Sequence, residues 1–533
     1  MDTDDPNAYG ASWYSATRVA APPRGRLTVE LDVDVCVIGA GLAGLTVALE
    51  VARLGWSVVV LEAQGVAWSA SGRNTGVVLP GFAVSASALV ERAGLDHAKA
   101  LWARSEAGAE YVRSAAREME GVALSEGGWL HVSRTDNPAA MASLAALLAG
   151  KFGAAVEPWP AGRVREALRS PHYFHALHHP RGFSLHPLNY ALGLAAAAEV
   201  AGARIFEDTP VAEIDPAGVR KRVVTRYSRV RAGHVVLAGN VHLPALVPQF
   251  SSTLTPVFST VVVTAPLGGE LHDAIRFPGA VSDTGPAGPH HRVVDGGRLM
   301  WSGRGTVWLG KPQRRADALM RQAGRVYPQL RGAKAEYAWT GASGSTVHGM
   351  PQIGEISPGL WLVSGFGGHG LNTTAMAGET VARAIVEGDT GWKLFSPFAL
   401  VWAGGTAGRA AQQVSGWAQR AGEELEGALA RRRDARRRRA EAAKAAAVAP
   451  VPVVSEAPPL SEPAPEPLPA AAAQEVAPDV LEGWPGGAAP AIPDATDSPG
   501  GPVKPRRKRG KKRRDAAPTE APAGGTPSGT EST

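Results

Sequence analysis

The chain has 533 residues, of which 44% are hydrophobic and 20% charged, as is typical of a globular protein with an enzyme-sized core. Its single cysteine, Cys36, excludes disulfides and cysteine-ligated metal sites, and the strand pattern around it predicts a buried thiol. Of the formal net charge of +6, residues 431–533 contribute +4, so the rest of the chain is nearly neutral. The polar start of the chain and the absence of a long apolar run predict a cytoplasmic protein without a membrane span.

After a polar N-terminal arm (residues 1–30), the pattern predicts a strand at Asp34–Ile38, a helix from Leu42 to about Leu54 and a strand at Ser57–Glu62. The turn between the first strand and the helix is Gly39-Ala40-Gly41-Leu42-Ala43-Gly44. In such a turn the first glycine allows the sharp bend, the second the approach of a pyrophosphate, and the third the close packing of the helix. Glu62, followed by Ala63, ends the second strand where a ribose hydroxyl needs an acceptor. These features predict a Rossmann-type dinucleotide site.

This fingerprint alone does not separate FAD from NAD, because both cofactors present the same ADP half. The polar run Trp68–Gly76 follows Glu62 closely and includes Ser71, Gly72, Arg73 and Asn74. Its hydroxyls, backbone amides and guanidinium favour a second contact with a long dinucleotide, and therefore FAD.

Farther along the chain, residues 86–120 and 138–150 have helical spacing, and strands are predicted at Gly127–Val132, Arg204–Ile214 and Arg222–Tyr227. The segment Arg231–Asn240 is predicted to be a strand that ends in a small-residue turn, which suits a returning strand of the nucleotide-binding domain. Alternating segments between Thr253 and Trp308 predict an antiparallel sheet, which we assign to a substrate domain. A strand at Trp361–Ser364 leads into Gly365-Phe366-Gly367-Gly368-His369-Gly370 and a helix at Thr373–Glu387.

This second glycine turn repeats the spacing of the first, but no strand ending in an acid follows its helix. A second dinucleotide site is therefore not expected. Backbone amides at the start of this helix would instead offset negative charge at the pyrimidine end of a reduced flavin.

Together these elements predict an α/β protein, with a FAD-binding Rossmann-type (glutathione-reductase-like) domain built from residues 31–85, 186–250 and 335–390. An α+β substrate domain built on the antiparallel sheet takes residues 86–185 and 251–334. A C-terminal helical segment (391–447) and a Pro/Ala-rich basic tail (448–533), which is predicted to be disordered, complete the chain.

Several stretches resemble the glycine/D-amino-acid oxidase (DAO) family of FAD-dependent oxidoreductases, above all its gamma-glutamylputrescine oxidase branch. The resemblance extends from about residue 12 to residue 425 and rests on Ser12-Trp13-Tyr14 with Pro22-Pro23, Ala70–Asn74, Phe183–Pro187, Met350–Gly354 leading to Gly365–Gly370, and more weakly Arg292 with Gly297–Leu299 and Gly303-Arg304. It implies a substrate sheet over the flavin ring. It also implies oxidation of a C–N bond in an amine or amino acid to an imine that hydrolyses, with oxygen as acceptor and hydrogen peroxide as product.

Carried over by position, the resemblance assigns Gly39, Gly41, Gly44 and Glu62 to the ADP part, Ser71 to Asn74 to the flavin-proximal loop, Val211 to adenine, and Gly368, His369 and Gly370 to the flavin ring. Asn74-Thr75-Gly76 replaces the family's usual Asn-Gly-Gly, and His348 replaces a frequent Asp. No cysteine lies near Met350, so FAD is expected to be non-covalent. The predicted strand Arg298–Ser302 lacks the lysine with which sarcosine oxidases activate oxygen, which leaves an amine dehydrogenase with another acceptor as an alternative.

His369 is the first candidate for orienting the substrate, although it could instead brace the glycine turn. His348 and Arg292 are weaker candidates. The pairs His178-His179 and His290-His291 lack an acid or cysteine at ligand spacing, so we expect surface-loop histidines and no metal site.

Two further hypotheses concern partners. The basic run at residues 505–514 would tether a flavoprotein to nucleic acid or an anionic membrane, but it lacks interleaved aromatics, so no specific nucleic-acid binding is expected. Electron supply by NAD(P)H is disfavoured by the single complete fingerprint and the absence of a CxxC motif. The expected partners are a small amine or amino acid and oxygen or another acceptor; the sequence leaves the individual substrate open.

Overall fold

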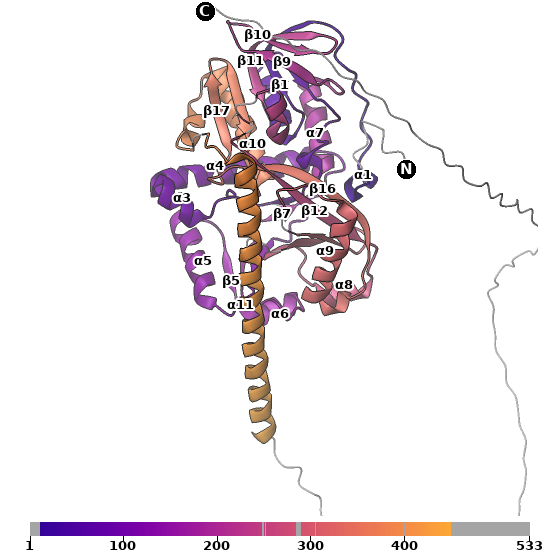
Figure 1. Ribbon diagram of the computed structural model, residues 1–533, viewed down its shortest axis with the longest axis vertical. Coiled ribbons are helices and arrows are strands. Elements are labelled where there is room, and N and C mark those ends of the chain that lie inside the picture. The colour runs from indigo at the N-terminus through magenta and orange to yellow at the C-terminus, as the bar shows by residue number, and fades with distance from the viewer. Residues whose placement is uncertain are drawn as a thin grey trace, which may run out of the picture. The chain divides into compact units, whose positions relative to one another are not determined.

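The computed structural model describes residues 11–448, apart from 248–249, 251, 284–288, 304 and 399. These residues form one compact unit (Figure 1). The tail predicted to be disordered lies outside the described residues from position 449 onward.

The first sheet has eight strands and a parallel centre. Its path runs β17 (Gln352–Ser357), β18 (Leu360–Ser364), β11 (Arg229–Leu237), β1 (Leu31–Ile38), β2 (Val58–Leu61) and β8 (Arg204–Phe206). In addition, β10 (Lys221–Thr225) pairs with β11, and β9 (Val211–Asp215) pairs with β10. Ile38 pairs with both Leu237 and Leu61 in parallel register. Because parallel strands end at the same edge, the residues after β1, β2 and β11 meet there.

Four helices pack into one core against this sheet: α2 (Leu42–Arg53), α4 (Leu95–Glu118), α7 (Pro187–Val200) and α10 (Gly370–Glu387). The predicted helix after the first glycine turn is thus confirmed to within one residue. The predicted substrate domain includes α4, but α4 packs directly on α10. A Cβ at Gly108 of α4 would lie 2.3 Å from the carbonyl oxygen of Asn372 in α10. Its apolar face, rather than its place in the chain, decides where it is buried.

The second sheet also has eight strands. Its order is β16 (Ala335–Ser345), β12 (Thr255–Thr264), β15 (Arg298–Ser302), β14 (His290–Val294), β13 (Ala280–Asp283), β4 (Trp129–Val132), β6 (Ala176–His179) and β5 (Glu157–Trp159). The predicted antiparallel sheet is confirmed except at β13 and β4, which run parallel.

Strand β16 corrects the predicted domain boundary, since residues 335–345 were assigned to the FAD-binding domain. It pairs with β12 from Thr255 opposite Ser345 to Thr264 opposite Ala335. This long ladder pairs the backbone N–H and C=O groups that the two strands turn toward each other. Local sequence patterns predict a strand but do not reveal its pairing partner. Helices α8 (Gly269–Ala274) and α9 (Pro312–Val326) cover one face of this second sheet.

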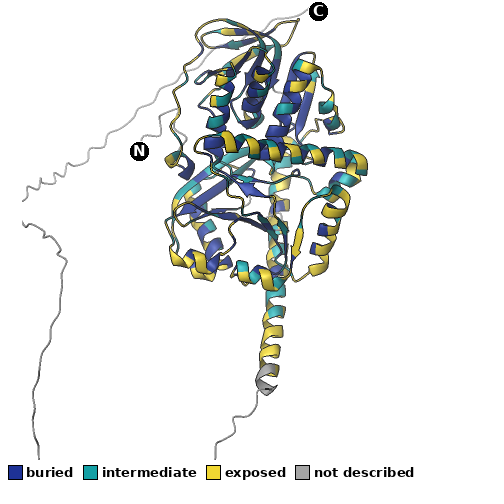
Figure 2. Ribbon diagram, turned by 180° about the vertical axis from the view of Figure 1, so that it is seen from behind, coloured by how far each residue is buried: buried dark blue, intermediate teal, exposed yellow. Residues whose placement is uncertain are grey.

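The remaining elements are short or peripheral: α1 (Trp13–Ala16), β3 (Val77–Val78), α3 (Ala86–Ala93), α5 (Pro138–Phe152), α6 (Ala161–Ala167), β7 (Phe183–Ser184), α11 (Gly405–Val448) and the 3-10 turns η1 (Ala70–Gly72), η2 (Asn240–Ala245), η4 (Pro328–Leu330) and η5 (Gly391–Phe395). In the N-terminal arm, Trp13 and Tyr14 are buried in the main core. Cys36 is buried and free, as predicted. In α11, the residues from Ala435 to Lys444 are exposed (Figure 2). Within the described residues, no helix has the length and apolar character that a membrane span requires.

Candidate cofactor and substrate site

Two neighbouring cavities of about 440 and 380 Å³ lie at the edge where β1, β2 and β11 end. They share the residues Gly41, Ala70, Ser71, Ala238 and Asn240, so they form one elongated site. The first cavity extends from these shared residues over the strand ends. The second extends between the Gly365–Gly370 turn and the second sheet.

The first glycine turn has the geometry that a bound pyrophosphate needs. Gly39 has a φ of +108°, which a residue with a side chain rarely adopts. A Cβ at Gly44 would lie 2.0 Å from the carbonyl oxygen of Gly39, so only glycine lets α2 begin here. Gly41 is the N-cap of α2 and supplies no side-chain cap. The amides at the start of α2 therefore face the shared part of the site, where an anion is stabilised.

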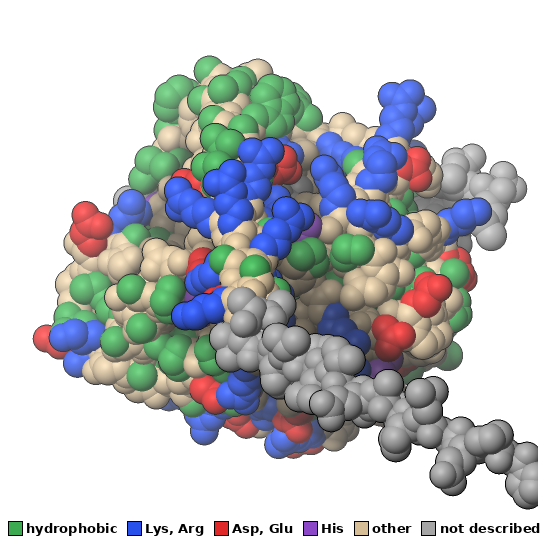
Figure 3. Space-filling model, turned by 90° about the horizontal axis from the view of Figure 1, so that it is seen from below, with side chains coloured by type: hydrophobic (Ala, Val, Ile, Leu, Met, Phe, Trp, Pro, Cys, Tyr) green, Lys and Arg blue, Asp and Glu red, His purple; other side chains and the backbone are tan. Residues whose placement is uncertain are grey.

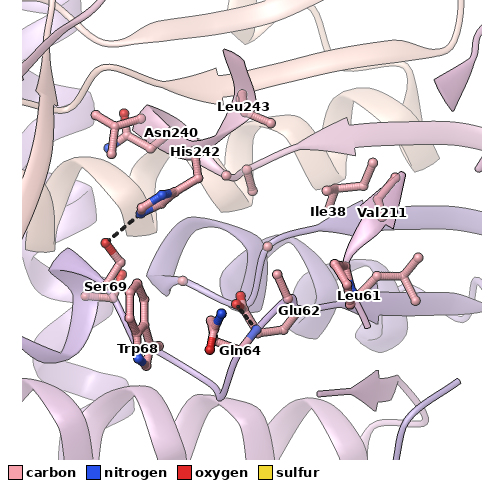
Figure 4. Close-up of a pocket in the computed structure, with 18 of the residues that line it drawn as sticks. Ile38, Leu61, Glu62, Gln64, Trp68, Ser69, Val211, Asn240, His242 and Leu243 are labelled. Carbon is pink, nitrogen blue, oxygen red and sulfur yellow. Dashed lines mark hydrogen bonds between the residues drawn. The ribbon is translucent and has the colours of Figure 1, made fainter. Parts of the chain in front are cut away.

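Glu62 lies directly after β2 in the wall of the first cavity (Figure 4). Its carboxylate accepts hydrogen bonds from the Ala40 amide at 2.7 Å and the Gln64 amide at 2.9 Å. Burial raises the pKa of Glu62, while these backbone bonds lower it. Glu62 thus fixes the glycine turn and presents carboxylate oxygens beside the cavity. Ala63 and Val211 also line this cavity.

The opposite wall includes residues that sequence reasoning missed. Ser69 Oγ lies 3.0 Å from His242 Nε2, and this contact joins the loop after Glu62 to η2 (Figure 4). Asn240, His242 and Leu243 follow β11 and come to the same edge as Gly39. The only sequence signal for them was the small-residue turn at Gly239 after a predicted strand.

The loop Ser71–Asn74 lies where the two cavities join. Ser71 Oγ accepts the Leu42 amide hydrogen at 3.0 Å and so ties the loop to α2. The Asn74 side chain donates to Ser71 O at 2.9 Å and accepts from the Gly76 amide at 2.8 Å. Ser71 and Asn74 line the second cavity, whereas Gly72 and Arg73 do not. Arg73 instead donates from Nε to Trp68 O at 2.8 Å, and burial lowers its pKa.

The second glycine turn forms the end of the second cavity. Phe366, Gly367, Gly368, His369 and Gly370 line it, and Gly365 lies just outside this lining. Helix α10 begins at Gly370, with His369 as an N-cap that makes no side-chain capping bond. The positive end of the α10 dipole therefore faces the cavity, where it would stabilise negative charge.

Of the three predicted substrate-orienting residues, the structure places only His369 in this cavity. Its Nδ1 lies 3.4 Å from Leu79 O, and burial lowers its pKa. His348 accepts the Met350 amide hydrogen at 3.1 Å and braces its own turn. Arg292 donates to Thr75 O at 2.9 Å and Leu185 O at 3.1 Å, behind the cavity lining.

The expectation of surface-loop histidines is wrong for both histidine pairs. His178 and His179 lie on β6, and His290 and His291 lie on β14. His291 is only 3% exposed and stacks on Trp301, whereas His290 lines the second cavity. Strand alternation sends His290 and His291 to opposite faces of the sheet, so only His290 of that pair reaches the cavity, and neither His178 nor His179 lines it. Among the described residues, no group of three or more histidine, cysteine or acidic side chains is arranged to hold a metal ion.

The floor of the second cavity consists mainly of sheet residues that the sequence did not single out. They are Trp129 from β4, Ser259 and Val261 from β12, Ser302 from β15, and Ser343 and Ser345 from β16. These residues come from distant segments without a shared motif, so only strand pairing brings them together.

A parallel sheet with a glycine turn, an acid after the second strand and a cavity that continues past the helix start defines a dinucleotide-binding protein. The sequence matches the family described as FAD dependent oxidoreductase (DAO) over residues 34–384. The chain belongs to this family, and its cofactor is FAD.

Among curated relatives, gamma-glutamylputrescine oxidoreductase of Escherichia coli K12 is 30% identical over 385 residues, which covers 71% of this chain and 89% of the relative. A probable oxidoreductase OrdL of Haemophilus influenzae is 30% identical over 379 residues, which covers 69% of this chain and 86% of the relative.

Solved structures support the fold. Glycine oxidase from Geobacillus kaustophilus aligns with a TM-score of 0.58 at 21% identity, over 70% of this chain and 99% of that one. L-proline dehydrogenase from P. horikoshii aligns with a TM-score of 0.57 at 19% identity, over 69% and 96%. These likenesses confirm the predicted α/β architecture.

Proposed function

We propose that this protein oxidises the C–N bond of an amine or amino acid to an imine, which water hydrolyses, and that oxygen takes up the two electrons as hydrogen peroxide. The observation that carries the proposal is the second cavity, which lies between the start of α10 and the second sheet. This space joins the first cavity through Gly41 and Ser71. A substrate there would lie between the sheet and the ring end of the cofactor.

Gly39, Gly41, Glu62, Ser71 and Val211 would hold the ADP part of FAD, and Gly367 to Gly370 would lie at its ring. FAD, when bound, accepts the two electrons and a hydrogen from the carbon that bears the nitrogen. The protein must then bind the amine unprotonated, because the nitrogen lone pair drives the oxidation. A neutral His369, whose pKa burial lowers, suits this role because it adds no positive charge beside the amine.

The electron acceptor is the second part of the proposal. Strand β15 carries no lysine, and its cavity-facing residue is Ser302. An amine dehydrogenase that passes electrons to another acceptor is therefore the second candidate. A cytoplasmic location and polyanion binding by the tail stay predictions.

The test is anaerobic mixing of the FAD-loaded protein with gamma-glutamylputrescine, putrescine, sarcosine, glycine and L-proline, followed by the flavin absorbance. We expect at least one amine to bleach it, and NADPH to leave it unchanged. Peroxide formed with the bleaching amine in air would support the oxidase, and slow reoxidation without peroxide would support the dehydrogenase. Bleaching by NADPH but by no amine would contradict the proposal.

A further inference from the structure

Three side chains on the second sheet form a hydrogen-bonded series that ends at the substrate cavity. Trp129 Nε1 lies 2.7 Å from Ser282 Oγ, and Ser282 Oγ lies 2.6 Å from His290 Nδ1. Ser282 is only 3% exposed. Trp129 and His290 both line the second cavity, whereas Ser282 lies behind them.

The chemistry of these groups fixes the proton on His290. An indole N–H can only donate, so Ser282 Oγ accepts from Trp129. The serine hydroxyl hydrogen then needs an acceptor, and among the described residues His290 Nδ1 is the one within reach. A neutral imidazole that accepts at Nδ1 carries its proton at Nε2. His290 therefore presents an N–H donor at Nε2.

His369 carries the opposite tautomer. A carbonyl oxygen only accepts, so the contact of His369 Nδ1 with Leu79 O places the proton on Nδ1. Its Nε2 keeps a lone pair and has no hydrogen bond to a described residue. The His369 ring lies 6.3 Å from the Trp129 ring, and the donor imidazole of His290 and the acceptor imidazole of His369 both line the same cavity.

Both rings are neutral near pH 7. His290 lines the cavity, yet the surrounding protein removes enough water to lower its pKa to about 4, helped by His131 and His369. Burial likewise lowers the pKa of His131 to about 4 and that of His179 to about 3. The described residues that line this cavity include no Asp, Glu, Lys or Arg, and Arg304 lies outside the described residues.

We propose that His290, held by Ser282 and Trp129, orients the substrate by donating from Nε2 to an uncharged oxygen on the substrate chain, while His369 Nε2 accepts from the amine. This inference rests on the proposed function and names its substrate class: a primary or secondary amine whose chain carries an amide, carbonyl or hydroxyl oxygen. An ionised carboxylate would find no described cation to pair with in this cavity.

The first experiment compares two amines of similar length, N-acetylputrescine, which has an amide oxygen, and hexylamine, which has none. We expect the FAD-loaded wild type to favour N-acetylputrescine in anaerobic flavin reduction. Ser282→Ala and His290→Leu should reduce this preference about tenfold, mainly through the apparent dissociation constant, since one hydrogen bond is lost. His290→Gln, which retains an N–H donor, should keep part of the preference.

The matched control is Ser133→Ala. Ser133 is a buried serine just after β4 whose hydroxyl bonds to Thr135 O at 3.0 Å, and it does not line the cavity. This variant should leave the preference unchanged. The orienting role would be overturned if His290→Leu lost affinity equally for both amines, or if both His290→Leu and Ser282→Ala kept the wild-type preference for N-acetylputrescine.

The second experiment needs no turnover. Long-range ¹H–¹⁵N NMR spectra of FAD-loaded protein labelled at histidine report which ring nitrogen carries each proton, and His290→Gln and His369→Gln assign the signals. We expect Nε2–H at His290, Nδ1–H at His369, and a mixture of tautomers at His290 in Ser282→Ala. Nδ1–H at His290 in the wild type would overturn the inference even if amines bleach the flavin. If no amine bleaches it, the proposed function fails, and the expected tautomers would still support the assignment at His290.

Discussion

At the scale of single residues, Arg292 shows how burial changes what a charged side chain does. The sequence made it a candidate for binding substrate, yet its guanidinium donates to Thr75 O and Leu185 O and contacts the Tyr14 hydroxyl at 3.3 Å. It thereby joins the flavin-proximal loop, the segment before α7 and the N-terminal arm to β14. We infer a structural role for Arg292.

Replacing Arg292 by Met should therefore lower stability rather than substrate affinity. The carbonyl oxygens of Thr75 and Leu185 would lose their buried donors, at a cost of about 2–4 kcal/mol in the free energy of unfolding. Denaturant unfolding of the FAD-loaded protein measures this loss. Arg117→Met is the control, because Arg117 is 57% exposed and pairs only at the surface. Weaker substrate binding at unchanged stability would favour the catalytic role instead.

At the scale of elements, the strand–turn–helix units position the cofactor site. The β1–α2 unit depends on a close contact between the turn and the helix, and the β18–α10 unit brings the second helix start to the same site. Neither N-cap residue supplies a side-chain cap; in α2 the Leu42 amide donates to Ser71 Oγ, and the amides that follow it face the site. This shared feature explains why one long cofactor fits between two glycine turns.

Gly44→Ala tests the first of these units. The added Cβ would meet Gly39 O at 2.0 Å and Val37 Cγ1 at 3.1 Å, so either α2 or the turn must move. We expect the purified protein to lose most of its FAD, as measured by the ratio of flavin to protein absorbance, with a lower melting temperature. Gly422→Ala in α11, where a Cβ meets nothing within 4 Å, should keep its flavin. Full flavin occupancy in Gly44→Ala would contradict the proposed packing.

At the scale of the whole molecule, α11 connects the body to the end of the described chain. Arg165 on α6 pairs with Asp434 on α11 at 3.0 Å, and Arg409 near the start of α11 donates to Val307 O at 2.8 Å. Basic side chains gather on the face seen in Figure 3. Helix α11 carries Arg431–Arg433 and Arg436–Arg439. Helix α11 thus belongs to the folded body, whatever the residues beyond it do.

Two truncations test separately the contribution of α11 and that of the residues after it. A chain that ends at Val448 should keep the flavin content, the melting temperature and the amine turnover of the full chain, because the site described above lies before that residue. A chain that ends at Ala403 also loses the contacts of Arg165 and Val307 with α11, and should melt at a lower temperature. Thermal unfolding followed by flavin fluorescence measures both. Loss of flavin on removal of residues 449–533 alone would contradict this division.

The sequence by itself determined the features that depend on short stretches of backbone. The turn Gly39–Gly44, the strand ends at Ile38 and Glu62, and helix α2 are encoded within about thirty residues, as expected of a βαβ unit. The second glycine turn and the helix after it were predictable for the same reason. These local elements, together with the family resemblance, were enough to predict FAD.

Only the tertiary structure decided what surrounds the reactive end of the cofactor. Trp129, Ser282 and His290 lie on three strands whose pairing joins residues far apart in the chain, and β16 enters the same sheet from beyond α9. Strand pairing and alternation, rather than residue type, decide which of two adjacent histidines lines the second cavity and which one packs on Trp301. The first glycine turn therefore predicted the cofactor, whereas the substrate wall required the assembled sheet.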